Sequence, residues 1–284
     1  MKRWAKQILK VTVVAVFLLF LIPYAYSYNI DGDVSDWGID LSLAEYMFYL
    51  DTHTPSGVNV DYVTEDNTDI HHGWVEVGPG WSYKNKYDVE AIYFDNDSTY
   101  LYIAIITGFP EAGLRSNDWN NPHFEAGDIA IDIDNDGVYE YAVDTSNNDS
   151  NNRGNDAFSK GHLYRVSEWY DVYYHSYPYD FSEADPFAIA QGEDKGSVDF
   201  AYSSNPINGH YVIEVAIPLV SLNLSYQDQL KIHWTMECGN DYLTLEADVD
   251  SPSGGGPVVP EPTTLALAAV GFIGFILKKG GKVC

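Results

Sequence analysis

Short runs of β-branched and aromatic residues, each followed by turn-forming residues, recur through the middle of this chain and limit what it can fold into. Residues 89–94 and 100–107 are two such runs, and the segment between them, Asp95-Asn96-Asp97-Ser98, is typical of a tight turn. We expect a hairpin there. No long window shows the 3.6-residue period of an amphipathic helix, so the sequence predicts an all-β fold.

Residues 127–134 show the clearest alternation in the chain. Three isoleucines fall on one face of the predicted strand and three aspartates on the other: Ile129, Ile131 and Ile133 against Asp128, Asp132 and Asp134. The turn Asn135-Asp136-Gly137 then leads into residues 138–144, which predicts a second hairpin. Further strands are expected at residues 163–166, 197–202, 211–217, 230–236 and 242–247. Many short strands with frequent turns predict a single antiparallel β-sandwich in residues 28–249.

The N-terminus has the order of a secretory signal peptide. Four basic residues within the first ten positions precede an apolar run at residues 11–22, and the small residues Ala25 and Ser27 follow it. We therefore expect residues 1–27 to be a signal peptide that forms a short helix, with an uncleaved anchor as the alternative.

A Pro-Glu-Pro motif, an apolar run and a basic pair close the chain. Residues 250–259 form a linker rich in Pro, Gly and Ser, and residues 260–284 form the expected tail. The tail contains Pro260, Glu261 and Pro262, an apolar run at residues 265–277, and then two lysines. Both terminal apolar runs are shorter than the roughly 20 residues that a spanning helix prefers, although lysine snorkelling extends the reach of the second run. Basic residues flank both runs on their outer sides, which predicts cytoplasmic termini and an exported middle.

This tail resembles the PEP-CTERM sorting domain, because the motif, the apolar helix and the basic cluster occur in the same order at the C-terminus. The resemblance implies an exported protein that an exosortase or archaeosortase processes near Pro260. It also implies a transmembrane sorting helix that holds the chain at the membrane before processing. An ordinary tail-anchor helix is the alternative.

Charge separates the terminal segments from the middle of the chain. Seven of the 15 Lys and Arg residues lie in the terminal segments, whereas 41 of the 42 acidic residues lie between them. A negative field of this size repels phosphates, so we expect no nucleic-acid partner. Acidity that serves only solubility is the alternative to cation binding. Cys238 is the only cysteine of the expected exported domain, which therefore has no internal disulfide, and we expect this thiol to be buried and inert.

Carboxylates alternate before a glycine in Asp132-x-Asp134-x-Asp136-Gly137, a pattern that can wrap oxygen ligands around a hard cation. The twelfth position counted from Asp132 is Val143 and not Glu, so an EF-hand is excluded. We expect Ca²⁺ at this hairpin and no organic cofactor. The alternative is an acidic face that meets solvent next to a simple turn. A second candidate calcium cluster contains Asp31, Asp33 and Asp36.

Three stretches in the middle of the chain share a pattern with one family. They are Ile30-Asp31-Gly32-Asp33-Val34-Ser35-Asp36-Trp37, then Asp88-Val89-Glu90-Ala91 leading into residues 100–104, and finally residues 211–219, where an acidic residue precedes an Ile-Pro turn. They resemble the CBM9-like and DOMON-like sandwich domains. The resemblance implies an extracellular β-sandwich that often binds sugars or other ligands and often contains calcium. Neither the family's sugar-stacking tryptophans nor a haem-ligand pair can be assigned here.

Aromatic residues give a second binding hypothesis. Four tryptophans in expected loops are candidates for stacking against sugar rings: Trp74, Trp81, Trp119 and Trp169. Covering the ends of the core is the alternative role for each. Three sequons predict glycosylation in a host that has the machinery: Asn96, Asn148 and Asn223.

The sequence contains no G-x-S-x-G elbow and no H-E-x-x-H helix. We therefore expect a non-enzymatic protein of the cell surface or extracellular matrix that contacts polysaccharide or like subunits. A carbohydrate-binding module is the first alternative, and a secreted polysaccharide hydrolase with paired carboxylates is a further one.

Overall fold

The computed structural model describes residues 28–42, 53–56, 60–64, 85–115, 122–146, 158–175 and 181–250. All of them belong to one compact unit, Tyr28–Gly256. The expected signal peptide and tail lie outside the described residues, as do Trp74, Trp81, Trp119 and Asn148. Among the residues that are described, no helix combines the length and the apolar character needed to cross a membrane.

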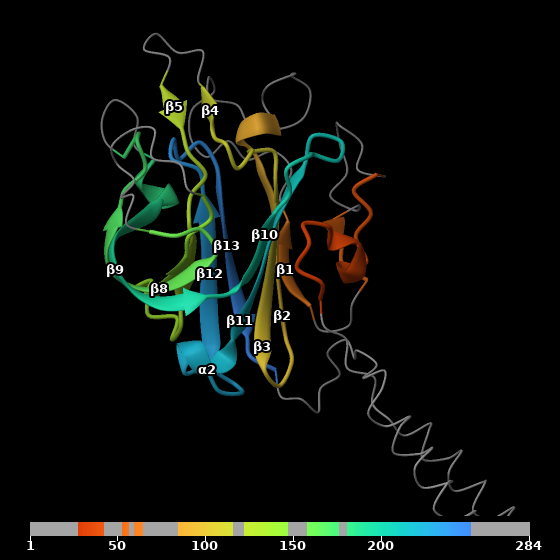
Figure 1. Ribbon diagram of the computed structural model, residues 1–284, viewed down its shortest axis with the longest axis vertical. Helices are drawn as coiled ribbons and strands as arrows, with labels where there is room; N and C mark the ends of the chain where they lie inside the picture. The colour runs from red at the N-terminus through yellow and green to blue at the C-terminus, as the bar shows by residue number, and fades with distance from the viewer. Residues whose placement is uncertain are drawn as a thin grey trace, which may run out of the picture. The chain divides into compact units, whose positions relative to one another are not determined.

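Two antiparallel sheets form the fold (Figure 1). The first has five strands in the order β1-β2-β3-β11-β10. Its strands are β1 (Asp61–Thr64), β2 (Val89–Asn96), β3 (Tyr100–Thr107), β11 (Tyr211–Pro218) and β10 (Asp199–Tyr202). The hairpin expected at residues 89–107 is therefore confirmed as β2 and β3, which pair along their length.

The second sheet has six strands in the order β13-β12-β6-β7-β8-β9. Its strands are β13 (Tyr242–Asp248), β12 (Gln229–Thr235), β6 (Ile129–Asp132), β7 (Tyr141–Val143), β8 (His162–Tyr170) and β9 (Ala188–Ser197). The second expected hairpin is confirmed as β6 and β7. Strand β9 was not predicted, because its sequence, Ala188-Ile-Ala-Gln-Gly-Glu-Asp-Lys-Gly-Ser197, lacks the apolar alternation of a half-buried strand. A polar, bulged strand of this kind suits the edge of a sheet, where charges hinder further pairing.

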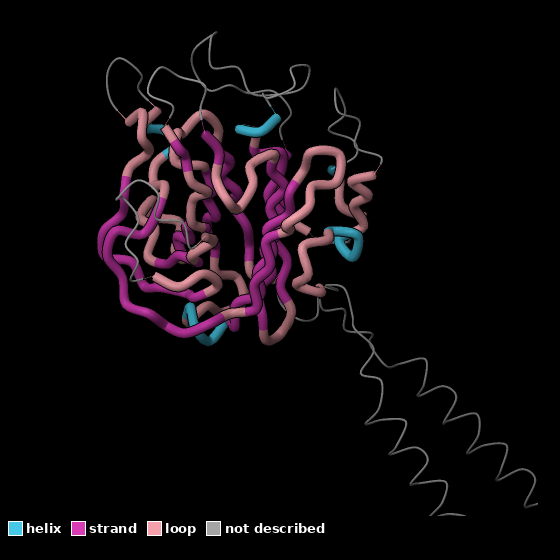
Figure 2. The backbone as a smooth tube through the Cα atoms, turned by 45° about the horizontal axis from the view of Figure 1, so that its top comes forward, coloured by secondary structure: helices cyan, strands magenta, loops and turns pink. Residues whose placement is uncertain are grey.

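Helical structure is minor in the described part of the chain. It includes one short α-helix, α2 (Leu219–Leu222), and the 3₁₀ turns η1 (Val34–Trp37), η3 (Asn85–Tyr87) and η4 (Ser182–Ala184). A small extra sheet pairs β4 (Leu114–Arg115) with β5 (His123–Phe124). Figure 2 shows these short cyan segments at the ends and margins of the magenta strands. The all-β prediction is confirmed.

Side chains from both sheets form one hydrophobic core. Ile103 and Ile213 come from the five-stranded sheet, whereas Ile131, Ile232 and Trp234 come from the six-stranded one, and all five are fully buried. The indole Nε1 of Trp234 donates to the carbonyl oxygen of Gly127 at 2.8 Å, which satisfies its polar atom. Cys238 is buried in the same core, as expected, and burial raises the pKa of its thiol.

A second, smaller core lies on the other face of the five-stranded sheet. There the N-terminal segment, drawn red in Figure 1, packs Trp37 and Ile39 against Tyr93 and Val212. Glu214 of β11 fastens this segment, because its carboxylate accepts hydrogen bonds from the Gly32 amide at 2.7 Å and the Trp37 indole at 3.1 Å. The Asp-Gly-Asp-x-x-Asp-Trp stretch at residues 31–37 thus folds over the outer face of the sheet.

Candidate calcium site

The turn between β6 and β7 gathers the acidic residues that the sequence singled out. The two strands pair Ile129 with Val143 and Ile131 with Tyr141, so the chain leaves and re-enters the sheet at neighbouring positions. Asn135 and Gly137 adopt positive φ angles of 56° and 92°, which Asn and Gly tolerate best. The turn therefore curls back toward the end of β6.

Asp132 organises this turn. Its side chain is fully buried, and its two carboxylate oxygens accept hydrogen bonds from the amides of Asp134 at 3.2 Å, Asp136 at 3.3 Å and Gly137 at 2.8 Å. Glu140 closes the other side, because its Oε2 accepts the amide hydrogen of Ile133 at 3.1 Å. Backbone amides thus fix two carboxylates in place before any ligand binds.

Four carboxylates converge here: Asp132, Asp134, Asp136 and Glu140. One oxygen from each lies within 4.8 Å of the others. Asp134 and Asp136 are exposed, whereas Glu140 is half-buried. Within the described part of the chain, no Lys, Arg or His forms an ion pair with any of the four. Burial raises the pKa of Glu140, and the negative charges of Asp132 and Asp134 raise it further.

Sequence reasoning missed Glu140 because it tested only the spacing of an EF-hand. Counted from Asp132, the cluster occupies positions 1, 3, 5 and 9, and the ninth residue returns on the β7 side of the turn. A search for acidic residues at alternate positions beyond Gly137 would have found it. Calcium takes six to eight oxygen ligands, so four carboxylates with backbone carbonyls or water can complete its shell.

The alternative of an acidic face that meets solvent is wrong for two of the three aspartates on that face. Asp132 is fully buried, and Asp128 is also buried, where its carboxylate accepts the amides of Thr145 at 3.2 Å and Ile189 at 2.9 Å. Burial raises the pKa of Asp128 well above its usual range. Asp128 therefore joins β9 to the β6–β7 hairpin and does not belong to the four-carboxylate cluster.

The aspartates of the second predicted calcium cluster accept hydrogen bonds from backbone amides close to them in the sequence. Asp33 caps η1 by accepting the Ser35 amide at 2.9 Å, Asp31 accepts the Asp33 amide at 3.0 Å, and Asp36 accepts the Asn29 amide at 2.7 Å. Groups of at least three metal-ligand side chains occur elsewhere among the described residues, but none of them includes these three aspartates.

Trp169 is the one predicted stacking tryptophan within the described residues, and it lies on strand β8, not in a loop as expected. The strand runs beyond residue 166 because β9 pairs with it through several register shifts. The Trp169 indole donates to the Tyr139 carbonyl oxygen at 2.9 Å, and the ring is half-buried.

Two sequons lie within the described residues. Asn96 is buried, and its side chain donates to the Asp250 carbonyl oxygen at 3.0 Å and accepts the Asp250 amide at 2.8 Å, which opposes a glycan there. Asn223 is exposed at the end of α2, with a φ of 57°.

Comparison with known proteins identifies one motif. Residues 258–279 match the PEP-CTERM protein-sorting motif, which covers Pro260, Glu261 and Pro262. The comparisons with curated proteins and with solved structures found no match for the chain. The CBM9-like and DOMON-like resemblance therefore gains no support from a neighbour. The sorting motif indicates an exported protein that an exosortase processes and that is anchored at the membrane before processing.

Proposed function

We propose that this chain is an exported, non-enzymatic protein of the cell surface or extracellular matrix whose β-sandwich domain binds Ca²⁺ at the β6–β7 turn. The sorting motif accounts for export and processing. The sandwich is supported by the single core that both sheets share. The observation that carries the calcium proposal is the convergence of Asp132, Asp134, Asp136 and Glu140 within 4.8 Å.

Electrostatics supports a cation at this turn. Four carboxylates at such separations repel one another, and like charges held close together destabilise the folded state. A divalent cation removes this repulsion and replaces the water that otherwise solvates the exposed oxygens. The backbone amides that hold Asp132 lower the entropy lost on binding, because that ligand is already oriented.

Calcium in the medium outside a cell suits such a role. A bound ion stabilises the turn between two strands of the six-stranded sheet. It also lowers the negative charge of a chain whose formal net charge is −27. Lower charge favours packing of like subunits and contact with acidic polysaccharide, which we propose as the partners of the exported domain.

The test is thermal unfolding of the full chain in detergent, with Ca²⁺ or with excess chelator, at matched high salt. Ligand at 100 times its Kd stabilises the folded state by about 2.7 kcal/mol, so the melting temperature rises clearly when calcium binds. The double variant Asp134→Asn with Asp136→Asn is expected to lose this rise. High salt screens general charge effects and leaves site binding visible.

The matched control is the double variant Glu193→Gln with Asp199→Asn. It removes the same charge from exposed positions on β9 and β10 that do not belong to the four-carboxylate cluster. The control is expected to keep the full calcium effect. An equal calcium effect in both double variants, or no effect in the wild type, would contradict the proposal.

A carbohydrate-binding module remains the alternative hypothesis. Of its four candidate tryptophans, only Trp169 lies within the described residues, and its indole already donates to a backbone carbonyl. Saturable binding to a glycan that Trp169→Ala abolishes would favour that alternative.

A further inference from the structure

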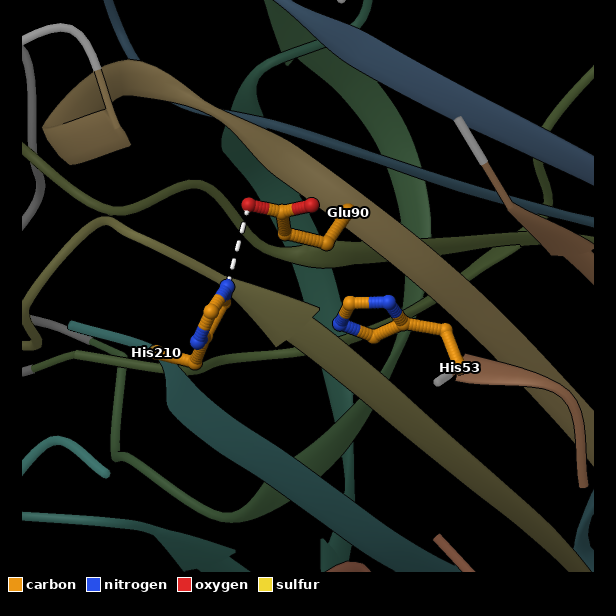
Figure 3. Close-up of side chains that lie close together, drawn as sticks. All are labelled: His53, Glu90 and His210. Carbon is orange, nitrogen blue, oxygen red and sulfur yellow. Dashed lines mark hydrogen bonds and ion pairs between the residues drawn. The ribbon is translucent and has the colours of Figure 1, made fainter. Parts of the chain in front are cut away.

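Three buried side chains with metal-ligand atoms lie close together at the five-stranded sheet, in a group separate from the four carboxylates of the β6–β7 turn (Figure 3). His53 precedes β1, Glu90 lies on β2, and His210 directly precedes β11. Their exposed fractions are only 5%, 6% and 4%. Sequence analysis did not single out any of them as a ligand, because they are distant from one another along the chain.

A bulge places Glu90 in this cluster. Val89 pairs with Thr107 and Ala91 pairs with Ile106, so Glu90 is an extra residue in the β2–β3 ladder. Such bulges redirect a side chain and frequently lie at functional sites. Ala91, the next residue, belongs to the smaller core beneath the N-terminal segment, and so does Tyr93, whose hydroxyl contacts the backbone of His53.

The distances fit a small tetrahedral ion. Glu90 Oε1 and His210 Nε2 are 3.2 Å apart, and one ligand atom from each of the three residues lies within 4.8 Å of the others. Bonds of about 2.0–2.1 Å in a tetrahedron separate neighbouring ligands by about 3.3 Å. One edge of the tetrahedron is therefore already formed, and a shift of the His53 ring completes the set.

The surroundings orient two of the ligands. His210 Nδ1 lies 3.3 Å from the Ile207 carbonyl oxygen. When Nδ1 carries the proton and donates it to that oxygen, Nε2 keeps a free lone pair on the side that faces Glu90. A metal-bound histidine usually has this arrangement, with one ring nitrogen on the metal and the other donating a hydrogen bond. The Tyr93 hydroxyl donates to the His53 carbonyl oxygen at 2.6 Å and so fixes the backbone that carries the third ligand.

We propose that His53, Glu90 and His210 form a site for Zn²⁺ or a similar transition-metal ion, with the fourth position open to water. Two imidazoles and one carboxylate form a donor set that suits zinc and does not suit calcium, which prefers oxygen. The ion joins the segment before β1 to β2 and to the start of β11. Because these residues are brought together only by folding, metal binding stabilises the domain.

A second cluster that contains a histidine could also bind zinc, and it must be told apart from the proposed site. Asp171, His175 and Asp185 also bring their ligand atoms within 4.8 Å, but Asp171 and His175 are exposed and the cluster has only one imidazole. The number of imidazoles bound to the metal therefore tells the two sites apart, and an all-oxygen shell would indicate the β6–β7 turn.

The experiment uses the untagged full chain in detergent, stripped with chelator and then supplied with one equivalent of Zn²⁺ in the presence of excess Ca²⁺. We expect one zinc ion per chain, and X-ray absorption is expected to show two imidazole ligands. Glu90→Gln and His210→Gln are expected to weaken zinc binding by more than the roughly 10- to 100-fold that losing an outer partner of a ligand costs. The control variant, His162→Gln, alters a half-buried histidine that pairs with Asp194 and is expected to bind zinc normally.

Two outcomes would overturn the proposal. One is a wild-type chain that retains no zinc, which would make the trio a buried ion pair of His210 and Glu90 beside His53. The other is zinc bound through one imidazole or through oxygen alone. X-ray absorption on the wild type decides the question even if the variants fail to fold. The β6–β7 calcium proposal is tested separately and does not depend on either result.

Discussion

Glu214 is a fully buried carboxylate that accepts hydrogen bonds from three donors of the N-terminal segment. Burial raises its pKa from 4.5 to about 7. Between these two pH values, Glu214 therefore keeps its proton in the folded protein, whereas the unfolded chain has released it. The stabilisation linked to that proton is fully present below pH 4.5 and is lost as the pH rises through about 7, by an amount on the order of 3 kcal/mol at most.

The prediction at this residue concerns the slope of stability with pH. Wild-type stability should contain a component that falls from pH 4.5 to pH 7, and Glu214→Gln, which cannot ionise, should lack it. Denaturant unfolding across this range measures the slope. His233 acts in the opposite sense, because burial lowers its pKa to about 4, so only the difference between wild type and variant is informative. The exposed control Glu246→Gln should keep the wild-type slope; a variant of Glu214 that also keeps it would refute this role.

Single residues also mark the limit of sequence reasoning. Alternation correctly predicted that Ile129 and Ile131 face the core, because a strand has only two faces. The same alternation gave no sign that Asp128 would be buried, since β9 covers it from a distant part of the chain. The position of Glu90 was equally unpredictable from the sequence. A bulge sets the direction of its side chain, and no local pattern specified that bulge.

At the scale of elements, the carboxylates that we assign to calcium at the β6–β7 turn differ in what else they do: Asp132 also holds the backbone of the turn, whereas Asp134 is exposed. Asp132 accepts three backbone amides, so Asp132→Ala is expected to cost about 2–4 kcal/mol even with chelator present. Asp134 is exposed, and Asp134→Asn is expected to be neutral or slightly stabilising in chelator, because it removes repulsion from Asp132 and Asp136. Urea unfolding of both variants in chelator compares the two costs. An equal loss of unfolding free energy in the two variants would contradict the structural role of Asp132.

Strands with a covered face were predictable, whereas the edge strand β9 was not. Hairpin β2–β3 combines β-branched runs with a turn, and every residue of β2 is buried. Strand β9 exposes most of its residues and pairs with β8 through bulges. Its position depends on the sheet that it joins, and local sequence carries little of that information.

At the scale of the whole molecule, the sorting motif and the acidic domain have separate tests. Replacing Pro260, Glu261 and Pro262 together by alanine should leave the C-terminal tail attached in a host with an exosortase, because the motif at residues 258–279 lacks its core. Mass spectrometry of the exported chain detects the retained tail. Pro257→Ala, just before the motif, is the matched control and should be processed normally; processing of the triple-alanine chain would contradict the role of the motif.

The most direct measurement is the number of calcium ions that the full chain binds at equilibrium, in detergent and at high salt. Our account predicts one saturable ion per chain, lost in the double variant Asp134→Asn with Asp136→Asn and retained in Glu193→Gln with Asp199→Asn. A wild-type chain that binds no calcium, or a cluster variant that binds as much as the wild type, would contradict it.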